Sequence, residues 1–245
     1  MRLDVFLAEE AICDSRTDAK NFILSGAVTV NGKIIKKPSH EISGDEDVAV
    51  DKSGKKYVGR GGLKLEAALS FFDVRVEGRL AIDVGASSGG FTDCLLQNGA
   101  SHVIAVDSGS GQLVESLRRD ERVTVIENYN ARYMKREDFE YLPNLAVMDV
   151  SFISATLIMP NLKSCLAPDA DFICLIKPQF EVGKSGLGKG GIVKSSSLRE
   201  RAKNDVIDFS KALGFSLVDV KESPIIGGDG NIEYLAHFKN KDSGI

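Results

Sequence analysis

Short apolar runs alternate with stretches of helical periodicity from Leu63 onward, and this alternation constrains the fold of the chain most. Runs of four to eight apolar residues are typical of strands buried in a parallel sheet. Strands and helices that alternate in this way build a doubly wound, Rossmann-like α/β sheet with right-handed crossovers. We expect the strands at 80–84, 103–106, 124–126, 145–148, 172–176, 216–220 and 234–238, and the helices at 63–72, 90–97, 112–118, 156–165 and 198–213. No long helix separates the last two strands, so we expect a C-terminal antiparallel hairpin.

The first 50 residues predict a separate, small α+β unit. A helix is expected over 16–24, with Ser15 as its N-cap. Asn31-Gly32 lies between two strand-like runs, which is a strong signal for a two-residue hairpin turn. The stretch 51–62 is polar and rich in glycine and lysine, as is typical of a linker. The sequence therefore predicts one domain at 1–58 and a second at 59–245.

The composition is that of an ordinary globular protein, with 43% hydrophobic and 27% charged residues and a net charge of −4. Basic residues nevertheless cluster: 33–64 holds eight Lys/Arg against five Asp/Glu, and 177–203 holds seven against two. Such patches can bind phosphates even on an acidic chain, although a solvated surface is the alternative. The four cysteines and three histidines are widely spaced, so we expect a reducing compartment and no metal site.

Nothing in the sequence suggests export or membrane insertion. Asp4, Glu9 and Glu10 interrupt the first apolar stretch, which argues against a signal peptide. No apolar segment approaches the roughly 20 residues that span a bilayer. We therefore expect a cytoplasmic protein without a membrane partner, and the oligomeric state stays open.

Two of the expected strands end directly in a charged residue. Leu145–Met148 is followed by Asp149, and Phe172–Ile176 is followed by Lys177. In open α/β sheets, ligands bind at the carboxyl ends of the strands. Because these strands are expected to be neighbours, a carboxylate and an amine should lie side by side in a candidate active site.

A glycine-rich loop follows the first strand of the expected sheet and opens a helix. Its pattern is G-x-x-x-G-G after an acidic residue, and the middle glycine of a dinucleotide fingerprint is replaced by Ser87. A second acid, Asp107, ends the next strand and suits ribose hydroxyls. An acid, a glycine loop and a ribose acid fit S-adenosylmethionine, which has a cationic end and no phosphates. We expect its contacts at Asp83, Gly85, Ser87, Gly89, Gly90, Phe91, Asp107 and, at the adenine edge, Asn130; a structural turn is the alternative.

Methyl transfer to a ribose hydroxyl requires loss of a weakly acidic proton. A lysine close to another lysine more readily presents a neutral amine, which can act as a base. The turn Asp149-Val-Ser-Phe152 lacks the Pro-Pro-aromatic pattern of base amino-methylation. Cytosine C5 methylation needs a cysteine nucleophile, and neither Cys165 nor Cys174 follows a strand end. These patterns favour a hydroxyl as the methyl acceptor.

The chain resembles the hemolysin A/TlyA family of ribosomal RNA ribose methyltransferases, with an FtsJ-like catalytic domain. Residues 1 to about 58 are similar to the RNA-binding domain first seen in ribosomal protein S4. The motifs that carry the resemblance are Gly59-Arg-Gly-Gly-Leu-Lys-Leu65, Asp83-Val-Gly-Ala-Ser-Ser-Gly-Gly-Phe-Thr92, Asp149-Val-Ser-Phe-Ile-Ser154, Ile176-Lys-Pro-Gln-Phe-Glu-Val-Gly-Lys184 and Gly230-Asn-Ile-Glu-Tyr234.

The resemblance implies a catalytic tetrad of Lys64, Asp149, Lys177 and Glu233. It assigns Lys177 as the general base, Lys64 and Asp149 as the groups that tune it, and Glu233 as a positioning group. It also implies cytidine targets in ribosomal RNA of the small and large subunits. Spacing alone favours a solvated helix lysine at Lys64 and a surface acid of the hairpin at Glu233. The resemblance overturns both of these interpretations.

An RNA substrate requires phosphate contacts on the protein. The expected contacts are Arg2, Arg16, Lys20, Lys33, Lys36, Lys37 and Arg60. The stretch 179–194 is rich in glycine and lysine and long for a connection within the sheet, so it is a candidate substrate loop or a plain surface insertion.

Three other classes of function stay open at this stage. One is a non-catalytic RNA-binding or ribosome-assembly factor, against which a complete tetrad argues. Another is a membrane-active hemolysin, for which no spanning or amphipathic segment is evident. The third is a nicotinamide-dependent enzyme, against which the missing middle glycine argues.

Overall fold

The computed structural model describes residues 1–13, 16–51 and 56–241, and the chain divides into two compact units, 1–56 and 57–245. The first unit contains α1 (Leu3–Glu9), α2 (Arg16–Ser25), β1 (Val28–Val30), β2 (Lys33–Ile34) and β3 (Val48–Val50). Its antiparallel sheet has the order β2-β1-β3, and the Asn31-Gly32 turn joins β1 to β2 as expected. The expected Ser15 cap and residues 52–55 of the expected linker lie outside the described residues.

A carboxylate without exposed surface connects two arginines of the first unit. Asp4 has no exposed surface, and its two oxygens accept hydrogen bonds from Arg2 and Arg16. These side-chain hydrogen bonds, Arg2 first, outweigh the effect of burial and lower the pKa of Asp4 to about 2. Asp4 is therefore a structural anchor, which joins α1 to α2 through Arg16.

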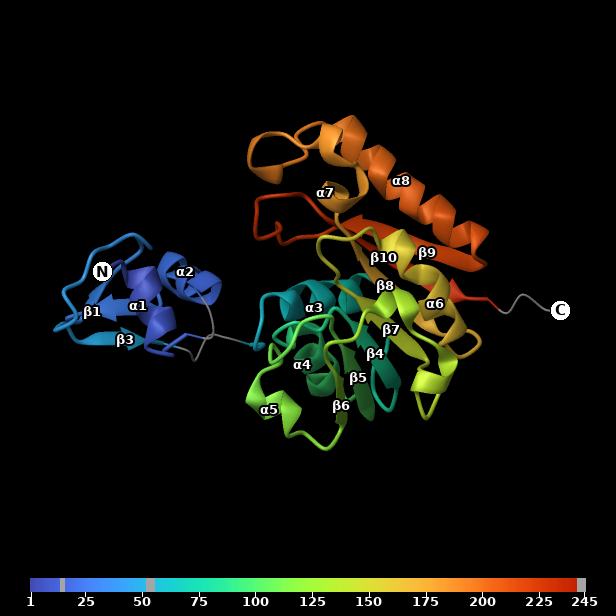
Figure 1. The fold of residues 1–245 in the computed structure, drawn as a ribbon, viewed down its shortest axis with the longest axis horizontal. Helices are drawn as coiled ribbons and strands as arrows, with labels where there is room; N and C mark the ends of the chain where they lie inside the picture. The colour runs from blue at the N-terminus through green and yellow to red at the C-terminus, as the bar shows by residue number, and fades with distance from the viewer. Residues whose placement is uncertain (14–15, 52–55, 242–245) are drawn as a thin grey trace. The chain divides into compact units, whose positions relative to one another are not determined.

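The second unit is built on one seven-stranded sheet in the order β6-β5-β4-β7-β8-β10-β9 (Figure 1). The strands are β4 (Leu80–Val84), β5 (His102–Val106), β6 (Val123–Ile126), β7 (Leu145–Met148), β8 (Asp171–Ile176), β9 (Phe215–Glu222) and β10 (Tyr234–Asn240). The strands from β4 to β8 pair in parallel, whereas β10 runs antiparallel to both β8 and β9. The expected fold class, including the C-terminal antiparallel hairpin, is confirmed.

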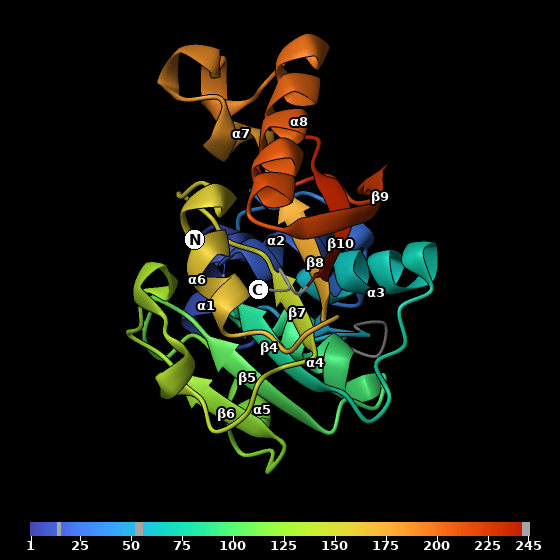
Figure 2. The same cartoon turned by 90° about the vertical axis from the view of Figure 1, so that its right-hand side faces the viewer.

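Helices cover both faces of this sheet, as the two views in Figures 1 and 2 show. The longer helices are α3 (Gly61–Phe72), α4 (Gly90–Gln97), α6 (Met159–Ser164) and α8 (Ser196–Ala212). On one face, Leu65 of α3 and Leu95 of α4 pack with alternate residues of the strands. On the other face, Leu162 of α6 and Val206 of α8 pack with the residues in between. The near-continuous apolar strands of the sequence are thus explained by burial on both sides.

Two predicted helices are shorter than expected. The helix predicted over 112–118 is only α5 (Glu115–Arg118), because the backbone N–H groups of 111–113 donate to the Glu127 carboxylate instead. The helix predicted over 156–165 is divided into a 3₁₀ turn (Ala155–Leu157) and α6. Pro160 lacks the N–H that an unbroken helix would require, which explains the division.

The predicted substrate loop contains local structure. It begins in α7 (Pro178–Glu181) and continues through the 3₁₀ turns Lys184–Gly186 and Lys189–Gly191. Asn231 is buried and binds this segment at two points: it accepts from the backbone N–H of Val193 and donates to the carbonyl of Gly191.

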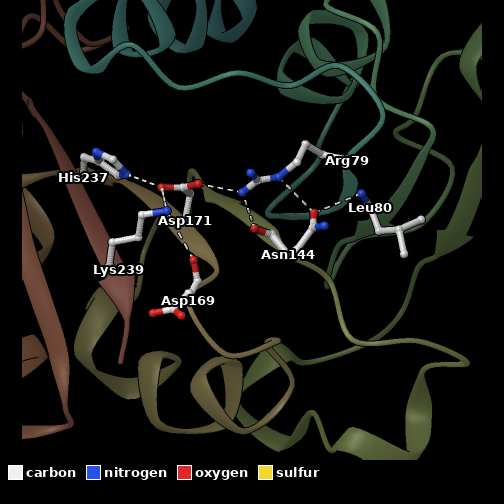
Figure 3. A network of polar contacts seen from close by, with 7 residues as sticks. All are labelled: Arg79, Leu80, Asn144, Asp169, Asp171, His237 and Lys239. Carbon is white, nitrogen blue, oxygen red and sulfur yellow. Dashed lines mark hydrogen bonds and ion pairs between the residues drawn. The ribbon is translucent and has the colours of Figure 1, made fainter. Parts of the chain in front are cut away.

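A polar cluster lies at the amino ends of the parallel strands (Figure 3). Asp171, the first residue of β8, is 5% exposed, forms ion pairs with Arg79 at 2.6 Å and Lys239 at 2.8 Å, and is hydrogen-bonded to the His237 ring at 2.7 Å. Arg79 also donates to Asn144, the residue before β7. We call Arg79, Asn144, Asp171, His237 and Lys239 the amino-end cluster.

Candidate active site

Two amine–carboxylate pairs line one pocket at the carboxyl ends of β7 and β8. The Lys177 Nζ lies 2.5 Å from Asp149 Oδ1, and the Lys64 Nζ lies 2.5 Å from Glu233 Oε2. The pocket has a volume of about 270 Å³. We call these four residues the carboxyl-end cluster. The structure therefore brings together all four residues of the predicted tetrad.

Sheet topology explains why residues so distant in the sequence meet here. β7 and β8 are parallel neighbours, so the residues that follow them, Asp149 and Lys177, lie side by side. β10 is antiparallel to β8, with Tyr234 opposite Ile176, so the residue before β10 lies at the same edge. That residue is Glu233. Lys64 reaches the site from the first turns of α3, with only 7% of its surface exposed.

The Glu233 carboxylate is held on three sides. One oxygen accepts from Lys64, and the other accepts from the Gln179 side-chain amide at 3.3 Å. A Cβ atom at Gly227 would lie 2.5 Å from that second oxygen, so a larger residue would displace the carboxylate. With 2% of its surface exposed, Glu233 is a fixed acceptor rather than a mobile surface acid.

The loops after β7 and β8 are connected to one another by several contacts. Lys177 donates to the Ser151 hydroxyl at 2.8 Å, and Glu181 accepts from the Ser154 hydroxyl at 2.5 Å and from the Ala155 N–H at 2.9 Å. Burial raises the pKa of Glu181, while its two hydrogen bonds oppose that effect. These contacts fix the two loops that carry Asp149 and Lys177 relative to each other.

Two phenylalanines lie beside the amines of this site. The rings of Phe152 and Phe180 are 5.3 Å apart, and both line the pocket with the tetrad. Phe152 is 92% exposed and has a φ of +64°, a conformation that is uncommon for a bulky residue. An exposed aromatic ring held in such a conformation beside a polar pocket is a candidate platform for a flat ligand.

A larger pocket of about 500 Å³ adjoins the first and shares Asp149, Ser151 and Phe152 with it. Its lining contains two carboxylates and no lysine or arginine. Asp107 accepts from the backbone N–H groups of Ser87 at 2.8 Å and Gly109 at 2.7 Å, so it holds its own loop against the glycine-rich loop. The lining residues are Val84, Gly85, Ser87, Val106, Asp107, Ser108, Gln112, Tyr129, Asn130, Ala131, Asp149, Val150, Ser151, Phe152, Ile153 and Ile158.

Close packing explains the glycines of the expected cofactor loop. Gly85 has a φ of +87°, and a Cβ atom there would lie 2.5 Å from the Asp149 carbonyl oxygen. Gly90 and Phe91 line a third pocket of about 180 Å³, which also contains Asp149 and Lys177. Gly89 lines none of the three pockets; a Cβ atom there would instead collide with Leu117.

Two of the expected cofactor contacts have other partners in the structure. Asp83 has no exposed surface and lies behind the pocket walls, where it accepts from the Thr92 hydroxyl at 2.7 Å. Burial raises its pKa to about 7, the Thr92 bond opposes this, and the charge of Asp149 adds to it. Asn130 lines the larger pocket, but its side-chain oxygen caps a 3₁₀ turn by accepting from the Arg132 N–H.

The seven expected phosphate contacts are all exposed. Arg2 and Arg16 also form ion pairs with Asp4, as described above. Arg60 belongs to the second unit and lines the tetrad pocket. Within the described residues there is no cluster of three potential metal ligands and no helix long and apolar enough to cross a membrane.

Sequence reasoning assigned no individual role to three residues that shape the site: Ser151, and Gln179 and Glu181 at the start of the candidate substrate loop. All three follow Asp149 or Lys177 within four residues, in motifs that the family resemblance had singled out. Their closeness in sequence to Asp149 and Lys177 is the one feature that could have marked them as site residues. The individual contacts depend on side-chain geometry across two loops, which spacing does not predict.

Comparisons with known proteins give a consistent assignment. The FtsJ-like methyltransferase family matches residues 57–240, and the S4 domain family matches residues 1–48. Hemolysin A of Brachyspira hyodysenteriae is 44% identical over 97% of this chain and 99% of its own. The 16S/23S rRNA (cytidine-2′-O)-methyltransferase TlyA of Mycobacterium tuberculosis is 43% identical over 98% of this chain and 90% of its own.

A solved structure agrees with these relatives. That of a candidate hemolysin from Streptococcus thermophilus superposes with a TM-score of 0.81 and 45% identity, covering 99% of this chain and 89% of that one. The resemblance to the hemolysin A/TlyA family that the motifs indicated is confirmed. The chain therefore belongs to the FtsJ-like methyltransferase family and carries an S4 domain at its N-terminus.

Proposed function

We propose that this chain transfers a methyl group from S-adenosylmethionine to the ribose 2′-hydroxyl of a cytidine in ribosomal RNA. One observation carries the proposal: the two amine–carboxylate pairs line a pocket that shares Asp149, Ser151 and Phe152 with the larger pocket beside the glycine-rich loop. The relative named TlyA from Mycobacterium tuberculosis, similar over 98% of this chain, supports the same reaction and substrate.

The chemistry of the larger pocket fits S-adenosylmethionine. Each Asp107 oxygen accepts one backbone hydrogen bond and, as part of a carboxylate, can accept another from a ribose hydroxyl. The apolar side chains of Val106, Ile153 and Ile158 suit a flat base. The lack of lysine or arginine in the lining fits a cofactor without phosphates. When bound, this cofactor supplies an electrophilic methyl group on a positively charged sulfur.

Lys177 is the proposed general base for the 2′-hydroxyl. It lines both the tetrad pocket and the third pocket beside the glycine-rich loop, and its amine is directed by Asp149 and the Ser151 hydroxyl. Lys64 places a second positive charge in the same pocket, where it favours an oxyanion. Glu233 holds Lys64 in position by its 2.5 Å contact. Asp83 supports the loop from behind, through Thr92, rather than touching the ligand.

The S4 unit and Arg60 supply the proposed RNA contacts. Lys20, Lys33, Lys36 and Lys37 are exposed on the first unit and suit the phosphate backbone. The exposed Lys184, Lys189 and Lys194 lie on the segment that Asn231 holds, which supports a role for that segment on the substrate side. Ribosomal subunits are the proposed partners, and the cytoplasm is the proposed compartment.

The test is transfer of labelled methyl groups to purified ribosomal subunits, with Lys177→Ala as the comparison. We expect labelled ribosomal RNA with the wild-type chain and background labelling with Lys177→Ala. Binding of both proteins to the subunits should be equal, because Lys177 is not one of the phosphate contacts. RNA binding without any methyl transfer by the wild-type chain would instead favour the assembly factor, and equal labelling by both proteins would remove Lys177 from the mechanism.

A further inference from the structure

Gln179 is a buried polar residue inside the tetrad pocket that the chemistry described so far does not require. It belongs to α7, two residues after Lys177, and 8% of its surface is exposed. It lines the pocket together with both ion pairs. Its side-chain amide can donate through nitrogen and accept through oxygen, so its orientation decides what it offers to a ligand.

The Glu233 carboxylate fixes the orientation of this amide. The Gln179 Nε2 lies 3.3 Å from Glu233 Oε1. An ionised carboxylate only accepts hydrogen bonds, so the nitrogen of the amide must face Glu233 and the oxygen must face away. Glu233 cannot easily turn, because Lys64 holds its other oxygen. Rotating the amide would place two acceptors against each other.

The Gln179 oxygen is left without a partner. Oε1 is buried and has no hydrogen-bond partner among the described residues. Support of Glu233 uses only the nitrogen, so that role does not account for a buried, unpaired acceptor. Leaving such an acceptor unpaired costs stability, and a substrate that brings a donor can recover that cost.

The neighbours of Gln179 indicate which part of a nucleotide would bring the donor. Phe152 and Phe180 line the same pocket, and aromatic rings are the usual platforms for an unstacked base. Within an RNA chain the 3′-oxygen is esterified and carries no proton. The target 2′-hydroxyl gives its proton to Lys177 in the proposed reaction. Other donors near the target are the exocyclic amine of the base and the 2′-hydroxyl of an adjacent nucleotide.

We propose that Gln179 Oε1 accepts a hydrogen bond from the exocyclic amine of the target cytosine and so selects cytidine over uridine. The inference rests on the proposed function and adds to it a residue that determines specificity. Cytosine presents an amine at the position where uracil presents a carbonyl oxygen. Uridine would therefore set two acceptors against each other, while Glu233 prevents the amide from turning. Because this oxygen is buried, the proposal requires the side chains that cover it to move aside as the base enters.

The experiment compares methyl transfer to the mapped nucleotide in subunits whose RNA carries cytidine, uridine or a pyrimidin-2-one nucleoside, which has hydrogen in place of the amine. For the wild-type chain, loss of the amine should lower kcat/KM by about 10- to 100-fold, as loss of one buried hydrogen bond predicts, and uridine should be worse. If the chain methylates no substrate, the proposed function fails. If it methylates cytidine and the amine-free nucleoside equally well, only the assignment to Gln179 fails.

A variant then identifies Gln179 as the partner. In Gln179→Met, loss of the Glu233 contact should slow transfer to all three substrates alike, so the decisive quantity is the ratio between cytidine and the amine-free nucleoside. That ratio should fall to near one, whereas Gln97→Met, at an exposed glutamine of α4, should keep the wild-type ratio. An unchanged ratio in Gln179→Met would show that a different group, such as one on a flanking nucleotide, reads the amine. The substrate series with the wild-type chain stands even if this variant does not fold.

Discussion

The two charge clusters of the second unit are built on the same two strands, at opposite ends. β8 begins with Asp171 of the amino-end cluster and is followed by Lys177 of the carboxyl-end cluster. β10 is preceded by Glu233 and carries His237 at its middle and Lys239 near its end. Figure 3 shows that at the amino end three cationic or donor side chains surround a single carboxylate. At the carboxyl end, two carboxylates and two amines line a pocket.

The difference between these clusters suggests that the amino-end cluster stabilises the fold and that the carboxyl-end cluster carries out the chemistry. At the amino end, several donors serve the Asp171 carboxylate, and none of the three pockets includes a member of that cluster. At the carboxyl end, each carboxylate is matched to one amine, and the charges face a space that a ligand can enter. We therefore expect substitutions at the amino end to lower stability and preserve activity, and substitutions at the carboxyl end to lower activity with little change in stability.

The largest expected effect is on catalysis at Lys177. Lys177→Arg keeps the positive charge, but arginine does not give up its proton, so it cannot act as a base. We expect methyl transfer to fall by about 10²- to 10⁴-fold, the usual contribution of a general base, with little change in stability. Single-turnover transfer to ribosomal subunits measures the effect. Lys239→Arg, at the lysine of the amino-end cluster, is the matched control and should retain activity; substantial activity in Lys177→Arg would show that charge alone suffices.

The next largest effect is on folding at Asp171. Asp171→Asn would leave Arg79 and the buried His237 without their carboxylate partner. Breaking a buried ion pair in this way costs about 3–5 kcal/mol of unfolding free energy. Urea denaturation would measure the loss, and methyl transfer per folded molecule should be preserved. A stable Asp171→Asn protein, or one that folds but is inactive, would erase the distinction between the clusters.

The pH dependence of stability should have opposite signs at Asp171 and Asp83. Burial alone would raise the pKa of Asp171, but hydrogen bonds from His237, Lys239 and Arg79 outweigh it and hold that pKa well below its usual range. The stabilisation from Asp171 is therefore complete above about pH 4 and is lost as the pH falls below that value. In contrast, Asp83, whose pKa is raised to about 7, keeps a proton in the folded chain that the unfolded chain releases above about pH 4. Stability should fall as the pH rises from 4 to 7.

Asp83→Asn tests the second sign. Asparagine can still accept from the Thr92 hydroxyl, but it carries no charge to bury. Relative to the wild-type chain, we expect the variant to gain about 1–3 kcal/mol of unfolding free energy at pH 8 and to gain little at pH 4. Denaturant titrations at the two pH values measure both quantities. A gain that is equal at both pH values would show that ionisation of Asp83 is not the cause.

The smallest effect is expected at Lys239. This side chain is 39% exposed, and two other groups also pair with Asp171, so its charge is partly screened and partly redundant. Lys239→Met should cost about 1 kcal/mol or less by urea denaturation. A loss as large as that of Asp171→Asn would mean that Asp171 depends on one cation, as each carboxylate of the carboxyl-end cluster depends on one amine.

The sequence predicted the part of the site that follows from parallel strands. The apolar runs before Asp149 and Lys177 predicted two neighbouring buried strands, and the structure places the two charges 2.5 Å apart. Lys64 and Glu233 were assigned only through the family motifs. The hairpin was predicted, but its position was not: β10 lies between β8 and β9, and this order brings Glu233 to the active edge. Strand order depends on long-range packing, which local patterns do not encode.

Side-chain hydrogen bonds explain most of the remaining differences. The periodicity of 112–118 predicted a helix over all of these residues. In the structure, backbone N–H groups at the start of this stretch donate to the Glu127 carboxylate instead. Asp83 looked like a ligand contact by its place before the glycine-rich loop, but the strand buries it. The sequence did not predict the ion pairs of Asp4 and Asp171. Their partners lie either far away in the sequence or too close for the spacing to form a recognisable motif. In each case the outcome depends on which donors the fold brings near a carboxylate.

The most direct test of the central claim is nucleoside mass spectrometry of ribosomal RNA after incubation of subunits with S-adenosylmethionine and one of three proteins. These are the wild-type chain, Asp149→Asn at the carboxyl end and Asp171→Asn at the amino end, each assayed where it is folded. We predict new 2′-O-methylcytidine with the wild-type chain and with Asp171→Asn, and none with Asp149→Asn. Equal methylation by Asp149→Asn and the wild-type chain, or no 2′-O-methylcytidine with any protein, would contradict the account.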